Sequence, residues 1–408
     1  MFQHQKITFY LILFFGLIFG AVSIFFYGDK VIDNEWGYML NILEKENILS
    51  IRQVRGEHVP NIFMPPLYVF FLFIVKKILF GIDILLIVVQ LIQLFLFLLS
   101  GVIMKKILLS FCSNNLASLG TAIFIFFPLN IYAIGQTSSV TLQVFFIISF
   151  IYFFIQIYET SLLKNTILFS ITAGFLILLR GEFFVFYIFS LSYLYFKNFS
   201  FKSTMLSILV TLLIISPYLW RNYKIFNVIT ITKSLGFNLL KGNNPVSKIE
   251  GLPLSERSYE IMSVVPELEE ELNNINPIKK YDLLADKIFF NKAINIIKND
   301  PERYIFLYFK KILAFIFIDT ESTYPNYYSP LHIIPKIIIS ITTILGAVML
   351  FNFRLNLYNF FILYYFLNIG LFSCFFILPR YSLSLLPIQL ILSMNLIKKL
   401  SLVFRHAN

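Results

Sequence analysis

Long apolar runs dominate this sequence, and its polar residues are gathered between them. A helix that spans a bilayer needs about 20 predominantly apolar residues. Runs of this kind lie near residues 7–27, 83–103, 116–133, 140–158, 164–180, 182–197, 203–219, 331–352, 357–378 and 381–397. The pattern therefore predicts an all-α protein that crosses the membrane many times.

Two shorter apolar stretches, 65–80 and 303–318, each contain a pair of adjacent lysines. Lysines in the middle of a span are costly, so these stretches fit interfacial or re-entrant helices better. If neither stretch spans, the basic loops fall on one side of the membrane and the acidic segments on the other, as the positive-inside rule requires. The inward basic residues then include Lys105, Lys106, Lys164, Lys197, Arg354, Lys398 and Lys399. We therefore predict ten spans, within a range of about 10–13.

The amino-acid composition agrees with the pattern of apolar runs and excludes several classes of protein. Apolar residues make up 58% of the 408 positions and charged residues only 13%, whereas soluble domains carry about a quarter charged residues. A soluble enzyme, a secreted disulfide domain and a nucleic-acid binder are therefore excluded. Two cysteines are too few for a disulfide framework, and the four histidines are too scattered for a metal cluster. We expect no cofactor, with a divalent metal left open.

The acidic residues are concentrated in two segments. Residues 28–60 hold six and residues 220–303 hold eleven, which together are 17 of the 22 in the chain. This placement predicts two water-facing segments on one side of the membrane. It divides the chain into an N-terminal transmembrane module, an external or interfacial helical subdomain, and C-terminal transmembrane helices. The predicted ranges are 1–219 with a first external loop at 28–60, then 220–330, then 331–408.

The first external loop contains the run Asp33-Asn34-Glu35 ahead of an amphipathic helix. A carboxylate at the low-dielectric edge of a membrane becomes more basic and can serve as a general base. The alternative is a solvated loop in which Asp33 or Asn34 caps the helix and Glu35 lies in its first turn. Composition alone favours this simpler alternative.

Three arginines are predicted at the outer boundary of the membrane. Arg180 is followed by Glu182 in a tight turn, Arg221 follows an apolar run, and Arg380 opens the last run. Such arginines can simply extend toward the headgroups of bulk lipid. They can also bind the phosphate of a specific lipid, and the residue types alone do not separate the two.

An ordered series of short motifs resembles a known family. The series is an acidic motif after the first helix, Pro65-Pro66-Leu67-Tyr68, Leu179-Arg180, Pro217 to Tyr223, Gly242-Asn243-Asn244-Pro245, Asn299-Asp300-Pro301 and Arg380-Tyr381. It looks like the bacterial members of the GT-C membrane glycosyltransferases, which are relatives of dolichyl-phosphate-mannose protein mannosyltransferases and of lipid A aminoarabinose transferases. The resemblance extends to about residue 397.

The resemblance implies a GT-C-like helical bundle and a reaction. A sugar would pass from a polyprenyl-phosphate donor to a glycan, lipid or protein acceptor, usually with inversion. This would occur on the extracytoplasmic face of the bacterial cytoplasmic membrane. Asp33 or Glu35 would be the general base, and Arg180, Arg221 and Arg380 would bind the donor phosphate. Supporting roles fall to Tyr38, Glu182, Asn222, Asn243 and Asn244.

The chain departs from the family pattern at two places. Asn34 stands four residues before Tyr38, where relatives commonly have Asp, and residues 135–139 lack the carboxylate that many relatives carry. Two other hypotheses therefore stay open: a lipid or glycan transporter or polysaccharide polymerase, and a non-catalytic scaffold. A transporter would place ionisable residues near the middle of several spans.

Overall fold

The computed structural model describes residues 2–80, 82–197, 199–253, 261–323 and 329–407. Part of the predicted external helical region, residues 254–260, therefore lies outside the described residues. The elements of the N-terminal half are α1 (Phe2–Val22), η1 (Ser23–Tyr27), α2 (Glu35–Glu46), β1 (Gln53–Val54), β2 (Glu57–His58), α3 (Leu67–Ile78), α4 (Leu85–Leu109), α5 (Asn114–Ile125), α6 (Pro128–Ile134), α7 (Val140–Thr160), α8 (Leu163–Leu179) and α9 (Phe183–Phe196). The remaining elements are α10 (Phe201–Phe226), α11 (Leu235–Gly242), α12 (Ile261–Val264), α13 (Glu267–Asn273), η3 (Ile278–Lys280), α14 (Tyr281–Asn299), α15 (Pro301–Ile316), α16 (Pro330–Leu350), α17 (Leu357–Ser373), η4 (Pro379–Ser384) and α18 (Leu386–Ala407).

Six helices of the described chain are long and apolar enough to cross a membrane: α1 with η1, α4, α7, α10, α16 and α18. A seventh span results if α5 and α6, which meet at 54°, form one bent crossing. Three shorter apolar helices, α8, α9 and α17, lie at the three remaining predicted runs. The chain is therefore an all-α polytopic membrane protein, which confirms the predicted fold class.

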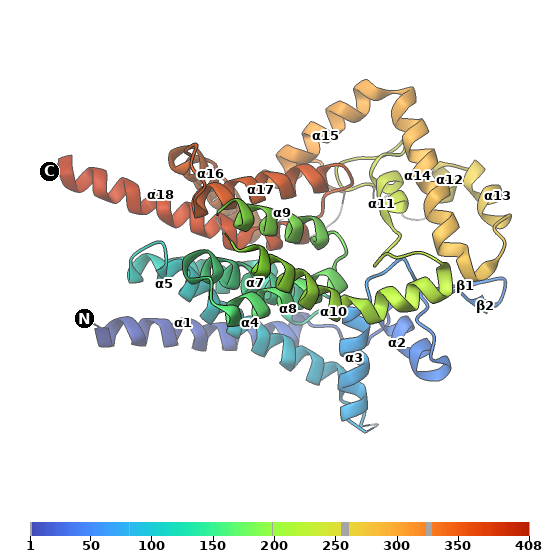
Figure 1. Ribbon diagram of the computed structural model, residues 1–408, viewed down its shortest axis with the longest axis horizontal. Coiled ribbons are helices and arrows are strands. Elements are labelled where there is room, and N and C mark those ends of the chain that lie inside the picture. Colours follow the sequence, from blue (N-terminus) through green and yellow to red (C-terminus); the bar gives the residue numbers. More distant parts are fainter. Residues whose placement is uncertain (1, 81, 198, 254–260, 324–328, 408) are drawn as a thin grey trace.

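Helices α3 and α15 differ from the bundle helices in direction. In Figure 1, α3 lies across the bundle, and α15 rises away from it. Neither belongs to the helices that are long and apolar enough to span. In the last turn of α3, the Lys76 ammonium lies 2.6 Å from the Glu44 carboxylate of α2. This ion pair explains how a lysine is accommodated in an apolar helix, and an interfacial or re-entrant position of α3 stays a prediction.

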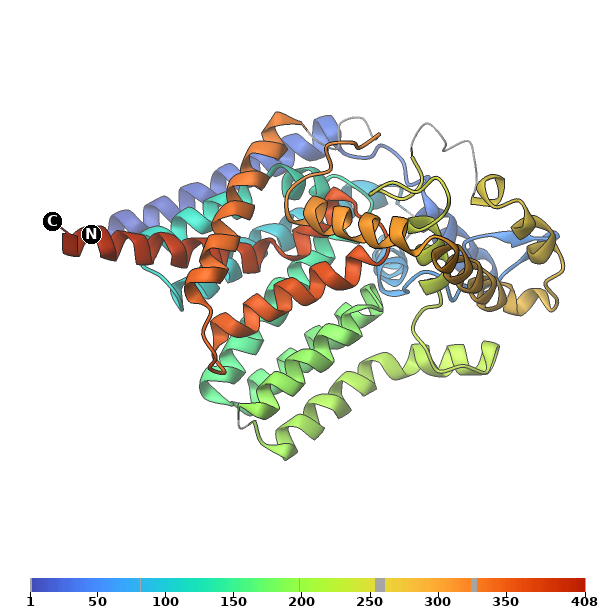
Figure 2. The ribbon, with the colours of Figure 1, turned by 90° about the horizontal axis from the view of Figure 1, so that it is seen from above.

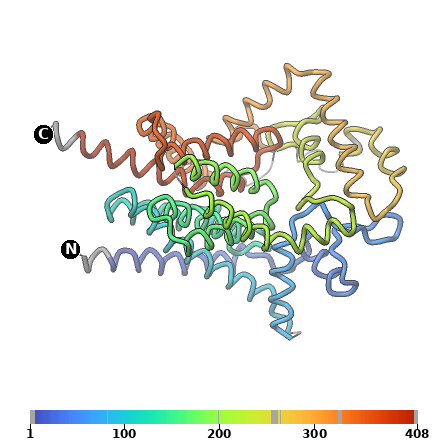
Figure 3. Tube along the Cα trace, viewed as in Figure 1, coloured from blue at the N-terminus to red at the C-terminus, as the bar shows by residue number. Residues whose placement is uncertain are grey.

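Both ends of the chain lie at the same end of the bundle (Figures 1 and 3), as an even number of spans requires. Several polar contacts cluster at that end. The Lys398 ammonium donates to the Phe111 carbonyl at 2.8 Å, and the Tyr193 hydroxyl donates to the Asn356 carbonyl at 2.7 Å. The loops that carry the predicted inward basic residues are therefore gathered together.

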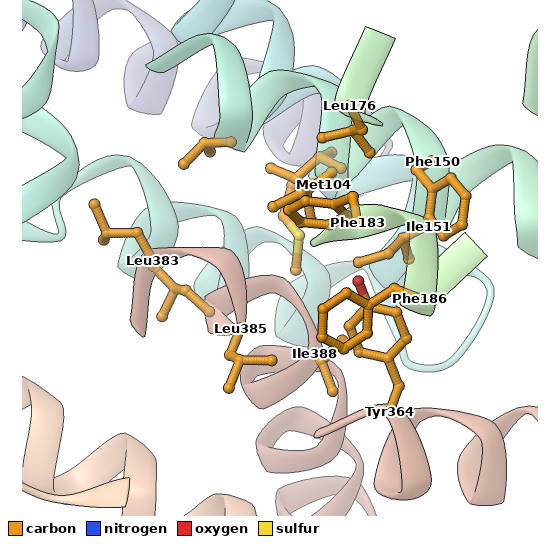
Figure 4. Close-up of a cluster of buried hydrophobic side chains, with 14 of the residues drawn as sticks. Met104, Phe150, Ile151, Leu176, Phe183, Phe186, Tyr364, Leu383, Leu385 and Ile388 are labelled. Atoms are coloured by element: carbon orange, nitrogen blue, oxygen red, sulfur yellow. The ribbon is translucent and has the colours of Figure 1, made fainter. Parts of the chain in front are cut away.

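One large apolar core holds the bundle together. Figure 4 shows part of it, where side chains of α4, α7, α8, α9, α17, η4 and α18 meet. Aromatic rings contribute stacked pairs, such as Phe154 with Phe360 at 3.8 Å between centroids and Phe150 with Phe169 at 4.5 Å. Such rings bury large apolar areas with little side-chain freedom, and this packing joins α7 to α8 and to α17.

A second, smaller core belongs to the external subdomain, which lies beyond the far end of the bundle (Figures 1 and 2). Its buried residues come from α11 to α14 and include Leu240, Leu268, Leu272, Phe289 and Ala293. α10 continues to Phe226 and so reaches past the predicted boundary at residue 219. The division of the chain at 219 and 330 stays a prediction.

The hairpin of β1 and β2 and an isolated β-bridge between Lys248 and Gly251 are the departures from all-α structure within the described residues. The two strands are antiparallel, and Gln53 is paired with His58. At the turn, Arg55 and Gly56 have φ angles of +51° and +82°. Positive φ at both central residues is the requirement of a tight hairpin turn.

Candidate active site

A cavity of about 420 Å³ opens at the end of the bundle that faces the external subdomain. Its walls come from six separate segments: the start of α2, residues 63–65, residues 138–140, the α8–α9 turn, residues 232–238 and the connection from α17 to η4. The polar lining residues are Glu35, Ser138, Ser139, Arg180, Glu182, Thr232, Ser234, Asn238 and Arg380. Aromatic and aliphatic side chains form the rest, so the cavity combines an apolar wall with convergent polar groups, as binding sites do.

The α8–α9 turn places Arg180 and Glu182 side by side in this cavity. The Arg180 amide still donates to the Leu176 carbonyl at 2.7 Å, after which the chain leaves α8. The Arg180 Nη1 atom lies 3.7 Å from the Glu182 Oε1 atom. The Arg180 Nε atom is buried and has no hydrogen-bond partner. The guanidinium therefore keeps donor capacity that the protein does not use.

Tyr381 brings the second guanidinium to the same place. The Cζ atoms of Arg180 and Arg380 each lie 5.8 Å from the centroid of its ring. Guanidinium groups at this distance from an aromatic ring are attracted to it. Phe372 and Phe376 support the ring at 5.6 and 5.9 Å. The sequence indicated both arginines and the Arg380-Tyr381 motif, but not that the Tyr381 ring also contacts Arg180.

The start of α2 decides which first-loop carboxylate reaches the cavity. Asn34 caps the helix, because its Oδ1 atom accepts from the amides of Trp36 and Gly37 at 3.1 and 3.3 Å. Both residues are exposed, but Glu35, in the first turn, lines the cavity, whereas Asp33 lies outside the lining. The geometry therefore distinguishes two residues that the sequence left equivalent.

A carboxylate from elsewhere does reach residues 135–139, which carry none of their own. The Oδ2 atom of Asp29 accepts from the Thr137 amide at 2.6 Å and from the Thr137 hydroxyl. The Asn34 side chain donates to the Thr137 carbonyl at 2.8 Å. Sequence reasoning missed Asp29, since 108 residues separate the two partners and no local pattern joins them.

Arg221 and Asn222 do not line the cavity. The Arg221 Nη1 atom donates to the Asn61 carbonyl at 2.5 Å and to the Asn222 Oδ1 atom at 2.8 Å. The buried Asn222 amide donates to the Thr230 carbonyl at 2.7 Å. Both side chains join the end of α10 to neighbouring loops, and a phosphate-binding role for Arg221 stays a prediction without support from this placement.

Asn243 and Asn244 form a buried turn that does not line the cavity either. The Asn243 amide donates to the Cys374 carbonyl at 2.9 Å. Asn244 folds back onto its own turn, with its amide 3.0 Å from the Lys241 carbonyl. At Gly242, an added Cβ would come within 2.1 Å of the Phe375 carbonyl oxygen. This turn therefore packs against the back of the segment that forms one cavity wall.

Tyr38 contacts the hairpin rather than the cavity. Its hydroxyl contacts the Nδ1 atom of His58 at 3.2 Å, and the His58 Nε2 atom lies 3.1 Å from the Glu46 carboxylate. Tyr38 thus joins α2 to the hairpin and is absent from the cavity lining.

Buried ionisable groups also lie outside the cavity. Asp282 of α14 is almost fully buried, 3.4 Å from the Arg52 Nε atom. Burial raises the pKa of Asp282, and the charge of Arg52 opposes that rise. Among the described residues, no group of three or more His, Cys, Asp or Glu side chains is arranged to hold a metal ion.

Comparison with known proteins finds similarity at the level of structure. No protein-family model and no curated protein sequence matches this chain. An archaeal oligosaccharyltransferase AglB from Archaeoglobus fulgidus, solved with an inhibitory peptide and a dolichol-phosphate, aligns with a TM-score of 0.53 and 12% identity over 98% of this chain and 52% of its own. A second structure, the A. fulgidus oligosaccharyltransferase tethered to an acceptor peptide containing the NVT sequon, gives a TM-score of 0.55 and 14% identity over 98% of this chain and 50% of its own.

This chain therefore spans about half the length of the proteins that it matches. Identity this low shows the fold and does not transfer an activity. The chain has the GT-C fold of membrane glycosyltransferases.

Proposed function

We propose that the protein is a membrane glycosyltransferase that transfers a sugar from a polyprenyl-phosphate donor to a glycan, lipid or protein acceptor. The observation that supports this most is the cavity itself. It lies at the end of a GT-C bundle opposite the two chain ends and contains two guanidinium groups and a first-loop carboxylate. A lipid phosphate and a hydroxyl acceptor require these groups.

The proposed mechanism assigns one task to each group. The Glu35 carboxylate takes the proton of the acceptor hydroxyl as its oxygen attacks the anomeric carbon. The bond from that carbon to the phosphate oxygen breaks, and the polyprenyl phosphate leaves with the electron pair. Arg180 and Arg380 stabilise the charge that develops on the phosphate. Attack from the side opposite the leaving group inverts the anomeric centre.

The proposed cellular setting follows from the topology. The loops with inward basic residues are gathered at the end opposite the cavity. Under the positive-inside rule this end is cytoplasmic, so the cavity faces the extracytoplasmic side of a bacterial cytoplasmic membrane. One A. fulgidus structure holds an inhibitory peptide and a dolichol-phosphate, and the other holds an acceptor peptide, so a peptide acceptor belongs among the candidates.

The test is transfer by purified protein in lipid nanodiscs, with radiolabelled polyprenyl-phosphate sugars and membrane-extracted acceptors. We expect Glu35→Gln to lower kcat by about 10²- to 10⁴-fold, because a general base contributes that much. Asp33→Asn is the matched control, since Asp33 is exposed like Glu35 but lies outside the cavity lining. The base assignment is wrong if the two variants lose activity equally, or if only Asp33→Asn does.

The transporter hypothesis predicts a different result. Proteoliposomes would then move a glycan across the membrane without a donor lipid and without a new glycosidic bond. Parallel addition of EDTA, and of Mg²⁺ or Mn²⁺, measures whether transfer requires a divalent metal. Loss of transfer with EDTA and its recovery with either ion would show a metal role beyond the protein groups assigned above.

A further inference from the structure

We propose that Glu182 is the resident counter-ion of Arg180 and is displaced when the phosphate of a donor lipid binds. Glu182 is then a specificity-determining residue that limits affinity for the phosphate, most strongly for the doubly charged leaving group. This inference rests on the proposed function, because it assumes that the cavity receives a lipid phosphate.

The contact between the two side chains is loose. Their closest atoms, Arg180 Nη1 and Glu182 Oε1, are 3.7 Å apart, which is longer than the 2.7–3.2 Å of a hydrogen bond. The Arg180 Nε atom has no partner at all. Glu182 therefore balances the charge of Arg180 but does not accept all the hydrogen bonds that the guanidinium can donate. A phosphate can offer better-aligned acceptors.

The turn allows the Glu182 side chain to move while its backbone stays in place. The Phe183 amide donates to the Arg180 carbonyl at 3.0 Å, and the Val185 amide donates to the Glu182 carbonyl at 3.1 Å. At Gly181, an added Cβ would meet the Thr232 hydroxyl at 2.8 Å, so the turn is packed closely. The Glu182 side chain itself is 32% exposed. Rotation into water therefore costs little, since a solvent-accessible ion pair contributes little to stability.

The balance of charge in the cavity explains how displacement of Glu182 would help the reaction. The cavity lining carries two carboxylates, Glu35 and Glu182, and two guanidinium groups, Arg180 and Arg380. A donor phosphodiester brings one negative charge, and the phosphate that leaves after transfer carries close to two. When Glu182 returns to Arg180, it competes with the leaving group and favours its release. Product release limits the rate of many enzymes, so this competition aids turnover.

The experiment measures binding of farnesyl phosphate to the whole protein in detergent, with farnesol and inorganic phosphate as the two partial probes. We expect Glu182→Gln to bind farnesyl phosphate about two- to fivefold more tightly than the unchanged protein, from the strength of partly exposed ion pairs. Farnesol affinity should be unchanged in the variant. Inorganic phosphate should gain by a similar factor, because Glu182 competes for the phosphate group itself, but it should bind more weakly than farnesyl phosphate in both proteins. If inorganic phosphate binds the unchanged protein as tightly as farnesyl phosphate does, free phosphate is the ligand of this site and the lipid assignment is overturned.

Glu44→Gln is the matched control. Glu44 also pairs with a cation on the outer side, Lys76, at 2.6 Å, but it does not line the cavity. The proposal is overturned if Glu182→Gln binds farnesyl phosphate equally or more weakly, or if Glu44→Gln produces the same gain. Glu182→Ala serves as a second variant if Glu182→Gln does not fold.

Turnover separates this inference from the proposed function. In the transfer assay, Glu182→Gln should lower the KM for the donor and strengthen inhibition by added polyprenyl phosphate. If the unchanged protein transfers no sugar, the proposed function fails. The binding comparison still decides whether Glu182 competes for the anion.

Discussion

Replacement of Lys311 by methionine should change how the stability of the protein depends on pH. Lys311 is fully buried in α15, where its ammonium donates to the Gly242 carbonyl at 2.9 Å and to the Asn243 Oδ1 atom at 3.0 Å. Burial lowers its pKa from 10.5 to about 7, and the nearby Cys374 opposes that fall. The folded protein therefore releases this proton at a pH where the unfolded chain still holds it.

The sign and size follow from these two pKa values. A group with a lowered folded pKa binds fewer protons in the folded state between the two values, so stability rises with pH over that window. From pH 7 to 9.5 the gain is about 3 kcal/mol in the free energy of unfolding. Lys311→Met removes the titrating group and keeps the apolar stem. It also leaves two buried acceptors unpaired at every pH, which lowers stability by a constant amount.

The assay is unfolding in mixed detergent micelles, followed by tryptophan fluorescence at pH 7 and pH 9.5. From pH 7 to pH 9.5, the free energy of unfolding of the unchanged protein should rise by about 3 kcal/mol more than that of Lys311→Met. Lys310→Met is the control, because the Lys310 side chain is 41% exposed and pairs loosely with Glu321 at 3.9 Å. Parallel pH profiles for the unchanged protein and Lys311→Met would refute the reasoning.

Two further variants test the framework around the cavity. The buried Gln93 amide donates to the Ile134 and Gln136 carbonyls at 2.8 and 2.9 Å, and its oxygen accepts from Tyr68. Gln93→Leu should therefore lower the free energy of unfolding by about 2–4 kcal/mol, and a thermal midpoint equal to that of the unchanged protein would contradict this. Burial raises the pKa of Asp319 from 3.8 to about 6, so the stability it contributes is present below pH 4 and is lost as the pH rises through 6. Asp319→Asn should reduce this loss between pH 4.5 and 7.5, and an unchanged profile would count against the assignment.

The helices of the bundle, and which residues meet at one of its ends, were predictable from the sequence for one reason. In lipid, backbone groups must be satisfied within each segment, so apolar runs of sufficient length become helices whatever their neighbours. Each crossing then fixes on which side the next turn lies. Glu35, Arg180, Glu182 and Arg380 are all next to the ends of predicted spans, and the structure brings them into one cavity.

The side-chain partners were not predictable in the same way. α10 continues seven residues past its predicted end at 219, so Arg221 stays inside a helix and turns toward the Asn61 carbonyl. Asn243 appeared available for a ligand, but carbonyls from α11 and from the α17–η4 connection satisfy its amide. Asp29 reaches Thr137 across 108 residues. Contacts of this kind depend on tertiary packing, which local patterns do not contain.

The close approach at Gly242 has a mechanical consequence. Its Cα packs directly on the Phe375 backbone, with no room for a side chain between them. Flexible side chains absorb small displacements, whereas two backbones in contact transmit them. A shift of α11, for example when a bulky molecule presses on the external subdomain, must therefore carry Phe375 and the adjoining cavity wall with it. The two apolar cores are separate, but this backbone contact couples them mechanically.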